Sequence, residues 1–296
     1  MPSPRLTQLL FVLAAAAIAA ACGAPDEKSN VAYDSRYGAT NMNIYLPSGG
    51  TAHRPAVMLV HGGAWSLGSK VDMQLQAQRL ARSGYVSASI DYRLGSDGAF
   101  PKDFQDCECA LAFLRLKADE YGLDPNRIAV LGYSAGGQLV SLLGVASHTP
   151  ELATDCVAAM FVPVAPPAAV ISGAGPSDMR ALASSSAVTD YLGGTPDQVP
   201  HAYDEASPIF HVRAGEPPFL IIQGDADWFV NIDAQARMRD ALAAAGNDVH
   251  MLKLAGGGHI LNPQVDPGEI ELAMATDEPE AWIAIEDFLA RTIGTP

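Results

Sequence analysis

Short, continuous apolar runs recur along the chain and alternate with stretches of helical length. The apolar runs are predicted strands, at residues 57–60, 85–90, 128–131, 157–162, 219–222 and 249–254. Helices are predicted between them, over residues 71–82, 101–121, 135–145, 233–245 and 280–291. Continuous apolar strands that alternate with helices are typical of a parallel sheet covered on both faces. The pattern therefore predicts an α/β fold with a mostly parallel central sheet, whose functional groups gather at the carboxyl ends of the strands.

One interval breaks this alternation. Residues 165–217 are rich in Pro, Gly, Ser and Ala. Because the interval lies between two strands that are followed by candidate catalytic residues, we interpret it as a small cap or pocket wall rather than a plain surface excursion. No internal repeat is visible, so we expect a single α/β domain over residues 31–296.

The N-terminal segment has the features of an export signal. Arg5 precedes an apolar run over residues 9–21, which is too short for a comfortable membrane span, and Cys22 follows three alanines. This ending resembles a bacterial lipoprotein signal, in which the cysteine is lipidated. We therefore expect a signal peptide over residues 1–21, lipidation of Cys22 and a polar tether over residues 22–30. The expected location is the cell envelope, on its periplasmic or outer surface; ordinary cleavage would leave a periplasmic or secreted protein.

Composition narrows the class of protein. The chain has 296 residues, of which 49% are hydrophobic and 17% charged, which favours a well-buried core over disorder. The formal net charge of −15 repels phosphate backbones, so nucleic acid is not an expected partner. Contact with a membrane is expected only through the N-terminal lipid. The sequence does not indicate an oligomeric state.

Three cysteines follow Cys22. Export permits a disulfide, and either Cys107 or Cys109 is a candidate to pair with Cys156. Cys107 and Cys109 lie two residues apart on a predicted helix and so face different directions. A shared metal site is therefore not expected, and no Cys/His spacing is typical of zinc.

The segment Gly-Tyr-Ser-Ala-Gly-Gly follows a predicted strand and opens a predicted helix. Its context matches a nucleophile elbow, a tight turn that needs very small neighbours around an exposed serine. Ser134 is the candidate nucleophile. The helix start supplies free N–H groups where negative charge would develop.

A second glycine-containing loop, His61-Gly62-Gly63-Ala64-Trp65, follows the strand at 57–60. We expect the main-chain N–H groups of Gly63, Ala64 and Ala135 to form an oxyanion hole. His61 precedes the nucleophile and is interpreted as a brace of its loop rather than as the base. Trp65 is expected to pack the loop.

Two further loops supply a carboxylate and an imidazole. Asp227 follows the strand at 219–222 and is the preferred partner of the base, whereas Asp225 is interpreted as a turn residue. His259 follows three glycines after the strand at 249–254 and is the candidate base. The order Ser134, Asp227, His259 is the order of α/β-hydrolases.

Together these motifs resemble the esterase/lipase branch of the α/β-hydrolases. The resemblance is close to the bacterial feruloyl-esterase-like group, the BD-FAE type, and to hormone-sensitive-lipase-like carboxylesterases. The residues that carry it are Asp227, His259 and the segments 61–65, 91–94, 124–128, 132–137 and 206–208. The chain departs from the family at Gln223, where His is usual, at Asn231, where Pro is usual, and at 164–168, where Gly-Pro-x-Asp is common. Residues 91–93 are interpreted as structural.

The resemblance implies an α/β-hydrolase fold and a serine hydrolase that cleaves carboxylic esters through an acyl-enzyme, without a cofactor or metal. The expected partner is a small-molecule or polysaccharide ester, with acetyl and feruloyl esters as candidates. One alternative is an amide hydrolase, such as an arylformamidase or an exopeptidase-like enzyme. A remote alternative is a non-catalytic binding protein on the same fold.

Overall fold

The computed structural model describes residues 24–49, 53–259 and 279–296. The expected signal peptide and Cys22 lie outside the described residues. Among the described residues, no helix combines the length and the apolar character needed to span a membrane.

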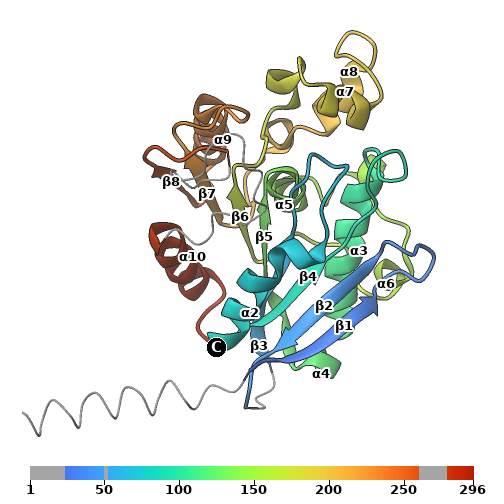
Figure 1. Ribbon diagram of the computed structural model, residues 1–296, viewed down its shortest axis with the longest axis vertical. Coiled ribbons are helices and arrows are strands. Elements are labelled where there is room, and N and C mark those ends of the chain that lie inside the picture. The colour runs from blue at the N-terminus through green and yellow to red at the C-terminus, as the bar shows by residue number, and fades with distance from the viewer. Residues whose placement is uncertain (1–23, 50–52, 260–278) are drawn as a thin grey trace, which may run out of the picture.

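The core of the protein is an eight-stranded sheet with the strand order β1-β2-β4-β3-β5-β6-β7-β8. Neighbouring strands from β4 to β8 run parallel, and β2 runs antiparallel to both β1 and β4 (Figure 1). The predicted mostly parallel sheet is therefore confirmed. The strands are β1 Asp26–Ala32, β2 Asn41–Leu46, β3 Arg54–Val60, β4 Val86–Ile90, β5 Leu123–Tyr133, β6 Ala169–Gly173, β7 Phe219–Gly224 and β8 Val249–Leu254.

Helices cover both faces of the sheet. Helices α2 and α10 pack on one face, and α3, α5 and α9 pack on the other (Figure 1). The α-helices are α2 Gln74–Arg82, α3 Lys102–Leu116, α4 Ala118–Tyr121, α5 Ala135–Val145, α6 Val157–Phe161, α7 Ser186–Leu192, α8 Pro200–Glu205, α9 Ile232–Ala244 and α10 Pro279–Thr292. Short 3-10 turns are η1 Lys70–Met73, η2 Pro150–Leu152, η3 Met179–Leu182 and η4 Pro208–His211.

Strand β3 shows why the central strands are apolar throughout. Met58 and Val60 point into the core on the α5 side, whereas Val57 and Leu59 point into the core beneath α2 and α10. All four are fully buried. Burying each such side chain contributes about 1.5–3 kcal/mol, so both faces of the strand favour the covered sheet.

Two predictions about elements are wrong. Residues 157–162 were expected to form a strand, but Val157–Phe161 is helix α6, which packs beside α3. Its apolar side chains are largely exposed, with Phe161 71% exposed, so the run does not mark a buried strand. The position in the sheet is taken by β6, which lies within the interval 165–217 and was not predicted as a strand.

The expected tether is also wrong from Asp26 to Asn30, because these residues belong to β1. Strand β1 is an edge strand with almost every side chain exposed, and it is held by backbone pairing with β2. Only Val31 is partly buried against the core, so the strand lacks the apolar run that marks the inner strands. Its charged side chains are typical of edges that avoid pairing with another chain.

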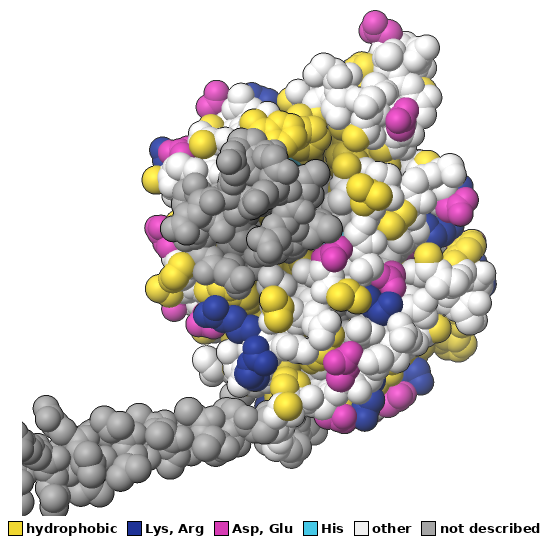
Figure 2. Space-filling view, in the orientation of Figure 1, with side chains coloured by type: hydrophobic (Ala, Val, Ile, Leu, Met, Phe, Trp, Pro, Cys, Tyr) yellow, Lys and Arg dark blue, Asp and Glu magenta, His cyan; other side chains and the backbone are white. Residues whose placement is uncertain are grey.

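The interval after β6 forms a cap. Helices α7 and α8 lie beyond the carboxyl end of the sheet, above α5 (Figure 1). Val188, Tyr191 and Tyr203 of the cap share a buried cluster with Trp65 and Ala135, which adjoins Ser134. The predicted cap is therefore confirmed. On the face shown in Figure 2, acidic and basic side chains are interspersed.

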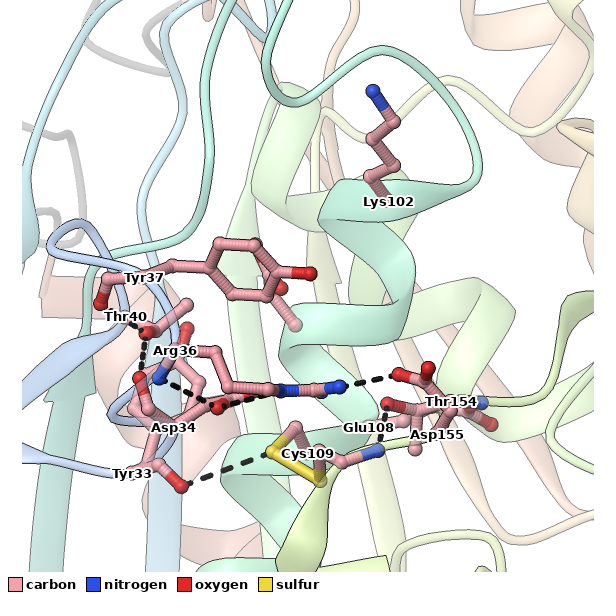
Figure 3. Close-up of a disulfide and its surroundings, with 12 residues drawn as sticks. Tyr33, Asp34, Arg36, Tyr37, Thr40, Lys102, Glu108, Cys109, Thr154 and Asp155 are labelled. Atoms are coloured by element: carbon pink, nitrogen blue, oxygen red, sulfur yellow. Dashed lines mark hydrogen bonds and ion pairs between the residues drawn. A yellow bond between two sulfur atoms is a disulfide. The ribbon is translucent and has the colours of Figure 1, made fainter.

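A disulfide joins Cys109 of α3 to Cys156, directly before α6 (Figure 3). Cys107 is a free, buried thiol, so the pairing that the sequence left open is decided by the direction in which each side chain leaves α3. Arg36 strengthens the same region by binding Asp34 at 2.7 Å and Asp155 at 3.1 Å. The bond and the ion pairs hold α6 against α3 and the β1–β2 connection.

Removing this disulfide should destabilise the protein. The two cysteines are 47 residues apart, and the chain entropy of such a loop corresponds to about 4 kcal/mol. The double variant Cys109→Ser/Cys156→Ser should lose up to that amount of unfolding free energy in urea titrations and become insensitive to dithiothreitol. The control Cys107→Ala should remain sensitive to dithiothreitol. A wild-type protein whose stability does not respond to the reductant would contradict the assignment.

Candidate active site

Ser134 occupies a sharp turn between β5 and α5. Its backbone has φ 52° and ψ −120°, a conformation that L-residues rarely adopt. The glycines around it are required by space. A Cβ on Gly132 would lie 2.2 Å from the carbonyl oxygen of Gly136, and one on Gly136 would lie 2.1 Å from that of Val60. The turn therefore depends on both glycines, as the elbow motif predicts.

The turn brings Ser134 to His259. The Oγ of Ser134 lies 2.9 Å from Nε2 of His259, and Nδ1 of His259 lies 3.0 Å from Oδ2 of Asp227. Because Nδ1 faces a carboxylate, it carries the ring hydrogen and leaves Nε2 free to accept the hydroxyl proton. The three residues follow β5, β7 and β8, whose carboxyl ends meet at one edge of the sheet. Thus the structure joins the three predicted residues in one hydrogen-bonded chain.

The carboxylate of Asp227 is held from several sides. Its Oδ1 accepts the N–H groups of Phe229 and Val230, each at 2.8 Å, and its Oδ2 accepts Nε2–H of Gln223 at 2.8 Å. Burial alone would raise its pKa, but the hydrogen bond and charge of His259 and the two N–H groups lower the pKa below its ordinary value. Asp227 is therefore kept ionised and oriented toward the imidazole.

Asp225 has a different role. Its Oδ1 accepts the N–H of Gly256 at 2.6 Å, and its Oδ2 lies 3.5 Å from Nζ of Lys253. These contacts tie the loop after β7 to the loop after β8. Asp225 thus helps to place the segment that carries His259, but it is Asp227 that contacts the ring.

The loop after β3 runs beside Ser134. Gly63, Ala64 and Trp65 all have positive φ, and a Cβ on Gly63 would lie 2.1 Å from the carbonyl oxygen of Leu67. Within the described residues, the N–H groups of Gly63 and Ala64 donate no hydrogen bond. Ala135 opens α5, where N–H groups lack intrahelical partners. None of the three expected donors thus has a main-chain partner in the part of the chain that the structure describes.

His61 braces this loop from below. It is fully buried, its Nδ1–H donates to the carbonyl of Gly62 at 2.6 Å, and its ring stacks on Tyr92 at 4.4 Å. The hydroxyl of Tyr92 donates in turn to the carbonyl of His61 at 2.9 Å. Burial lowers the pKa of His61, which favours the neutral form of the ring. In this geometry His61 is placed to hold the loop and does not reach Ser134.

Trp65 links the loop to the cap. Its side chain is 2% exposed, its Nε1–H donates to Oε1 of Gln138 at 3.0 Å, and its ring stacks on Tyr191 at 4.4 Å. The hydroxyl of Tyr191 donates to Oδ1 of the fully buried Asp103 at 3.2 Å. The predicted packing role of Trp65 is confirmed. Gln138, Tyr191 and Asp103 were not found from the sequence, because no local motif marks contacts between such distant segments.

Residues 91–93 form ion pairs and hydrogen bonds within the fold, in agreement with their expected structural role. Arg93 forms a buried ion pair with Asp106 at 2.7 Å, and Asp91 binds Nζ of Lys70 at 2.5 Å. Gln223 has a role beyond its motif position, because its amide supports Asp227. In the sequence, the only indication that Gln223 supports Asp227 was that Gln stands where the family usually has His.

Cavities adjoin the loop after β3 on two sides. One of about 310 Å³ lies between Ala64, Trp65 and the cap residue Tyr191. Another, of about 830 Å³, lies behind His61 near Tyr37 and is separate from the Ser134–His259 pair. Among the described residues, no three or more His, Cys, Asp or Glu side chains form a group that could hold a metal ion.

The sheet, the strand–serine–helix turn and the order of the three linked residues define a protein of the α/β-hydrolase fold. Solved structures support this class. The chain is similar to "Truncated form of carbohydrate esterase from gut microbiota", with a TM-score of 0.78 and 23% identity over 91% of this chain and 97% of that one. It is also similar to esterase 2 of Thermogutta terrifontis phosphorylated by paraoxon, with a TM-score of 0.70 and 23% identity over 91% and 95% of the chains.

Within this class the chain belongs to the BD-FAE family, whose model matches residues 42–242. The chain is 33% identical to Esterase LipC of Mycobacterium tuberculosis over 71% of this chain and 53% of that protein. It is 24% identical to the isoprenylcysteine alpha-carbonyl methylesterase ICME of Arabidopsis thaliana, over 74% and 53%. The chain therefore spans about half the length of these curated relatives. The resemblance inferred from the motifs is confirmed.

The buried carboxyl of Asp103 should make stability depend on pH. Burial raises its pKa to about 8, although Tyr191 and the N–H of Phe104 hydrogen bond to it. In the unfolded chain the group titrates near its ordinary value of 3.8. Between these values the native state holds a proton that the unfolded state releases, so the contribution of Asp103 to the unfolding free energy falls as pH rises, by at most about 1.4 kcal/mol per pH unit.

The variant Asp103→Asn imitates the protonated carboxyl and cannot lose the proton. Urea unfolding at pH 5, 6.5 and 8 should show the variant gaining stability relative to the wild type at each step upward. The exposed Asp97→Asn serves as control and should keep the wild-type slope. Parallel pH profiles for wild type and Asp103→Asn would show that Asp103 does not titrate in this window.

Proposed function

We propose that this protein is a serine hydrolase that cleaves carboxylic esters through an acyl-enzyme intermediate. The single observation that carries the proposal is the hydrogen-bonded chain from Ser134 through His259 to Asp227. It lies beside main-chain N–H groups of Gly63 and Ala64 that donate to no other described residue. A serine is a weak nucleophile unless an adjacent base takes its proton. Relatives that are named as esterases, such as Esterase LipC, support the same reaction class.

In the proposed first step, Oγ of Ser134 attacks the ester carbonyl carbon while Nε2 of His259 takes the hydroxyl proton. The carbonyl oxygen becomes an oxyanion that accepts hydrogen bonds from the N–H groups of Gly63, Ala64 and Ala135. Each such donor lowers the barrier by about 3 kcal/mol in comparable sites. Asp227 stabilises the imidazolium that forms.

The tetrahedral intermediate then collapses. The bond between the carbonyl carbon and the alcohol oxygen breaks, and that oxygen takes the proton from Nε2 of His259. Water repeats the sequence on the acyl-enzyme: His259 takes a proton from the water, the hydroxide attacks the acyl carbon, and Ser134 recovers its proton as the acid leaves. The residues of the chain supply every proton transfer in this scheme.

Substitutions in the hydrogen-bonded chain test this function. Ser134→Ala should abolish cleavage of 4-nitrophenyl acetate and labelling by a fluorophosphonate probe. Asp227→Asn should lower kcat by a factor on the order of 10³–10⁴, because the imidazole loses its orienting charge. The matched control Asp225→Asn removes a carboxylate two residues away and should retain kcat within about tenfold, since its partners are Gly256 and Lys253.

The outcomes separate the alternatives. Unchanged hydrolysis by Ser134→Ala would exclude the serine mechanism. Equal losses in the two aspartate variants would remove the assignment of Asp227. Matched ester and anilide substrates distinguish an esterase from an amide hydrolase, and faster turnover of the anilide would overturn the preference for esters.

We also propose that the protein is exported and lipidated at Cys22, on the strength of the apolar run over residues 9–21 that ends at this cysteine. Expressed in a bacterium with a lipoprotein pathway, the wild type should partition into Triton X-114, and its N-terminal peptide should carry the mass of the acyl groups. Cys22→Ser should move the protein to the aqueous phase. A wild type found in the aqueous phase, cleaved near Ala21 or Ala24, would instead show an ordinary signal.

A further inference from the structure

Trp228 stands out among the three tryptophans of the chain. Trp65 and Trp282 are buried, at 2% and 1% exposure, whereas Trp228 is 78% exposed. A single exposed aromatic side chain is common on protein surfaces. This one, however, directly follows Asp227 in the sequence, and its ring lies close to that of the proposed base His259.

The indole is held beside the imidazole of His259. The ring centroids of Trp228 and His259 are 6.1 Å apart, and those of Phe229 and His259 are 5.2 Å apart, both in edge-to-face arrangements. The backbone on which Trp228 sits is fixed, because Oδ1 of Asp227 accepts the N–H groups of Phe229 and Val230. Trp228 is thus presented at a defined distance from the base by the same turn that holds the carboxylate.

The proposed mechanism determines which part of the ester lies nearest to His259. His259 must give its proton to the oxygen of the leaving alcohol, so that oxygen lies within hydrogen-bonding reach of Nε2. The carbonyl oxygen, in contrast, lies toward Gly63, Ala64 and Ala135. The alcohol portion of the ester therefore departs past His259, whose ring Trp228 contacts edge to face.

We propose that the indole of Trp228 is a stacking platform for a sugar ring that forms the alcohol portion of the ester substrate. The proposal rests on the proposed function and adds a substrate class to it. The degree of exposure favours a sugar over an apolar alcohol. An apolar group binds well only where most of its surface is enclosed. A pyranose can place one C–H face on an aromatic ring at about 3.5–4 Å while its hydroxyl groups stay in water.

Binding can be tested without catalysis. In the Ser134→Ala variant, Trp228 is the exposed fluorophore, because Trp65 and Trp282 are buried. A monoacetylated methyl xyloside should protect the indole from quenching by acrylamide in a saturable way, and Trp228→Phe in the same background should remove the protected signal. Quenching that is unchanged up to 100 mM sugar ester would overturn the proposal.

Kinetics supply the second test. The acetates of methyl xyloside, ethanol and phenol share the acyl group and differ only in the alcohol. Trp228→Ala should lower the ratio of kcat/KM for the xyloside over ethyl acetate by about tenfold, equivalent to about 1.4 kcal/mol, with most of the change in KM. Trp228→Tyr should restore most of the ratio. The control Phe161→Ala removes another largely exposed aromatic ring, that of α6, and should leave the ratio unchanged.

Failure of this proposal is distinguishable from failure of the proposed function. A wild type that cleaves none of the three acetates contradicts the esterase assignment. A wild type that cleaves them, with the same ratio in Trp228→Ala, contradicts only the role of Trp228. A larger loss on phenyl acetate than on the xyloside would assign the platform to aryl alcohols and overturn the choice of a sugar.

Discussion

The backbone turn at Ser134 is the constraint on which the rest of the site depends. A residue with φ 52° between a strand and a helix persists only if the surrounding structure holds it there. Here the N–H of Ser134 donates to the carbonyl of Gly173 in β6, and Gly136 packs on the carbonyl oxygens of Val60 and His61. The strained turn is therefore clamped by neighbouring strands, and the serine hydroxyl is directed away from the core toward the imidazole.

The loop after β3 is kept in place from both sides. His61 and Tyr92 support it from the sheet, and Tyr191 covers Trp65 from the cap. A loop that presents unpaired N–H groups pays a desolvation penalty unless a ligand accepts them, so its shape has to be imposed by such packing. Electrostatic preorganisation of this kind needs rigid donors, and the stacking of Tyr191 on Trp65 contributes to that rigidity.

Much of the site was predictable because its determinants are local. Gly132 and Gly136 mark a turn at Ser134 that has no room for a Cβ, and Gly256 before His259 has a positive φ. Each of these loops follows an apolar run that marks a buried strand. Strands β3, β4, β5, β7 and β8 were predicted for the same reason, whereas β2 and β6 were missed. Edge strand β1 and helix α6 were also missed, because the polar run of β1 buries no face and the apolar run of α6 lies outside the sheet. Burial, which is a tertiary property, was the missing information.

The sequence by itself determined the class of fold and the kinds of residue at the site, since strand periodicity and turn chemistry act over a few neighbouring positions. Only the tertiary structure decided the pairings between distant segments. It placed Asp227 against His259 and turned Asp225 toward Gly256, and it joined Cys109 rather than Cys107 to Cys156. Each contact depends on the direction of a side chain in the packed protein. For the aspartates a motif match already favoured Asp227, but for the two cysteines the sequence offered no preference, because nothing local records which one faces Cys156.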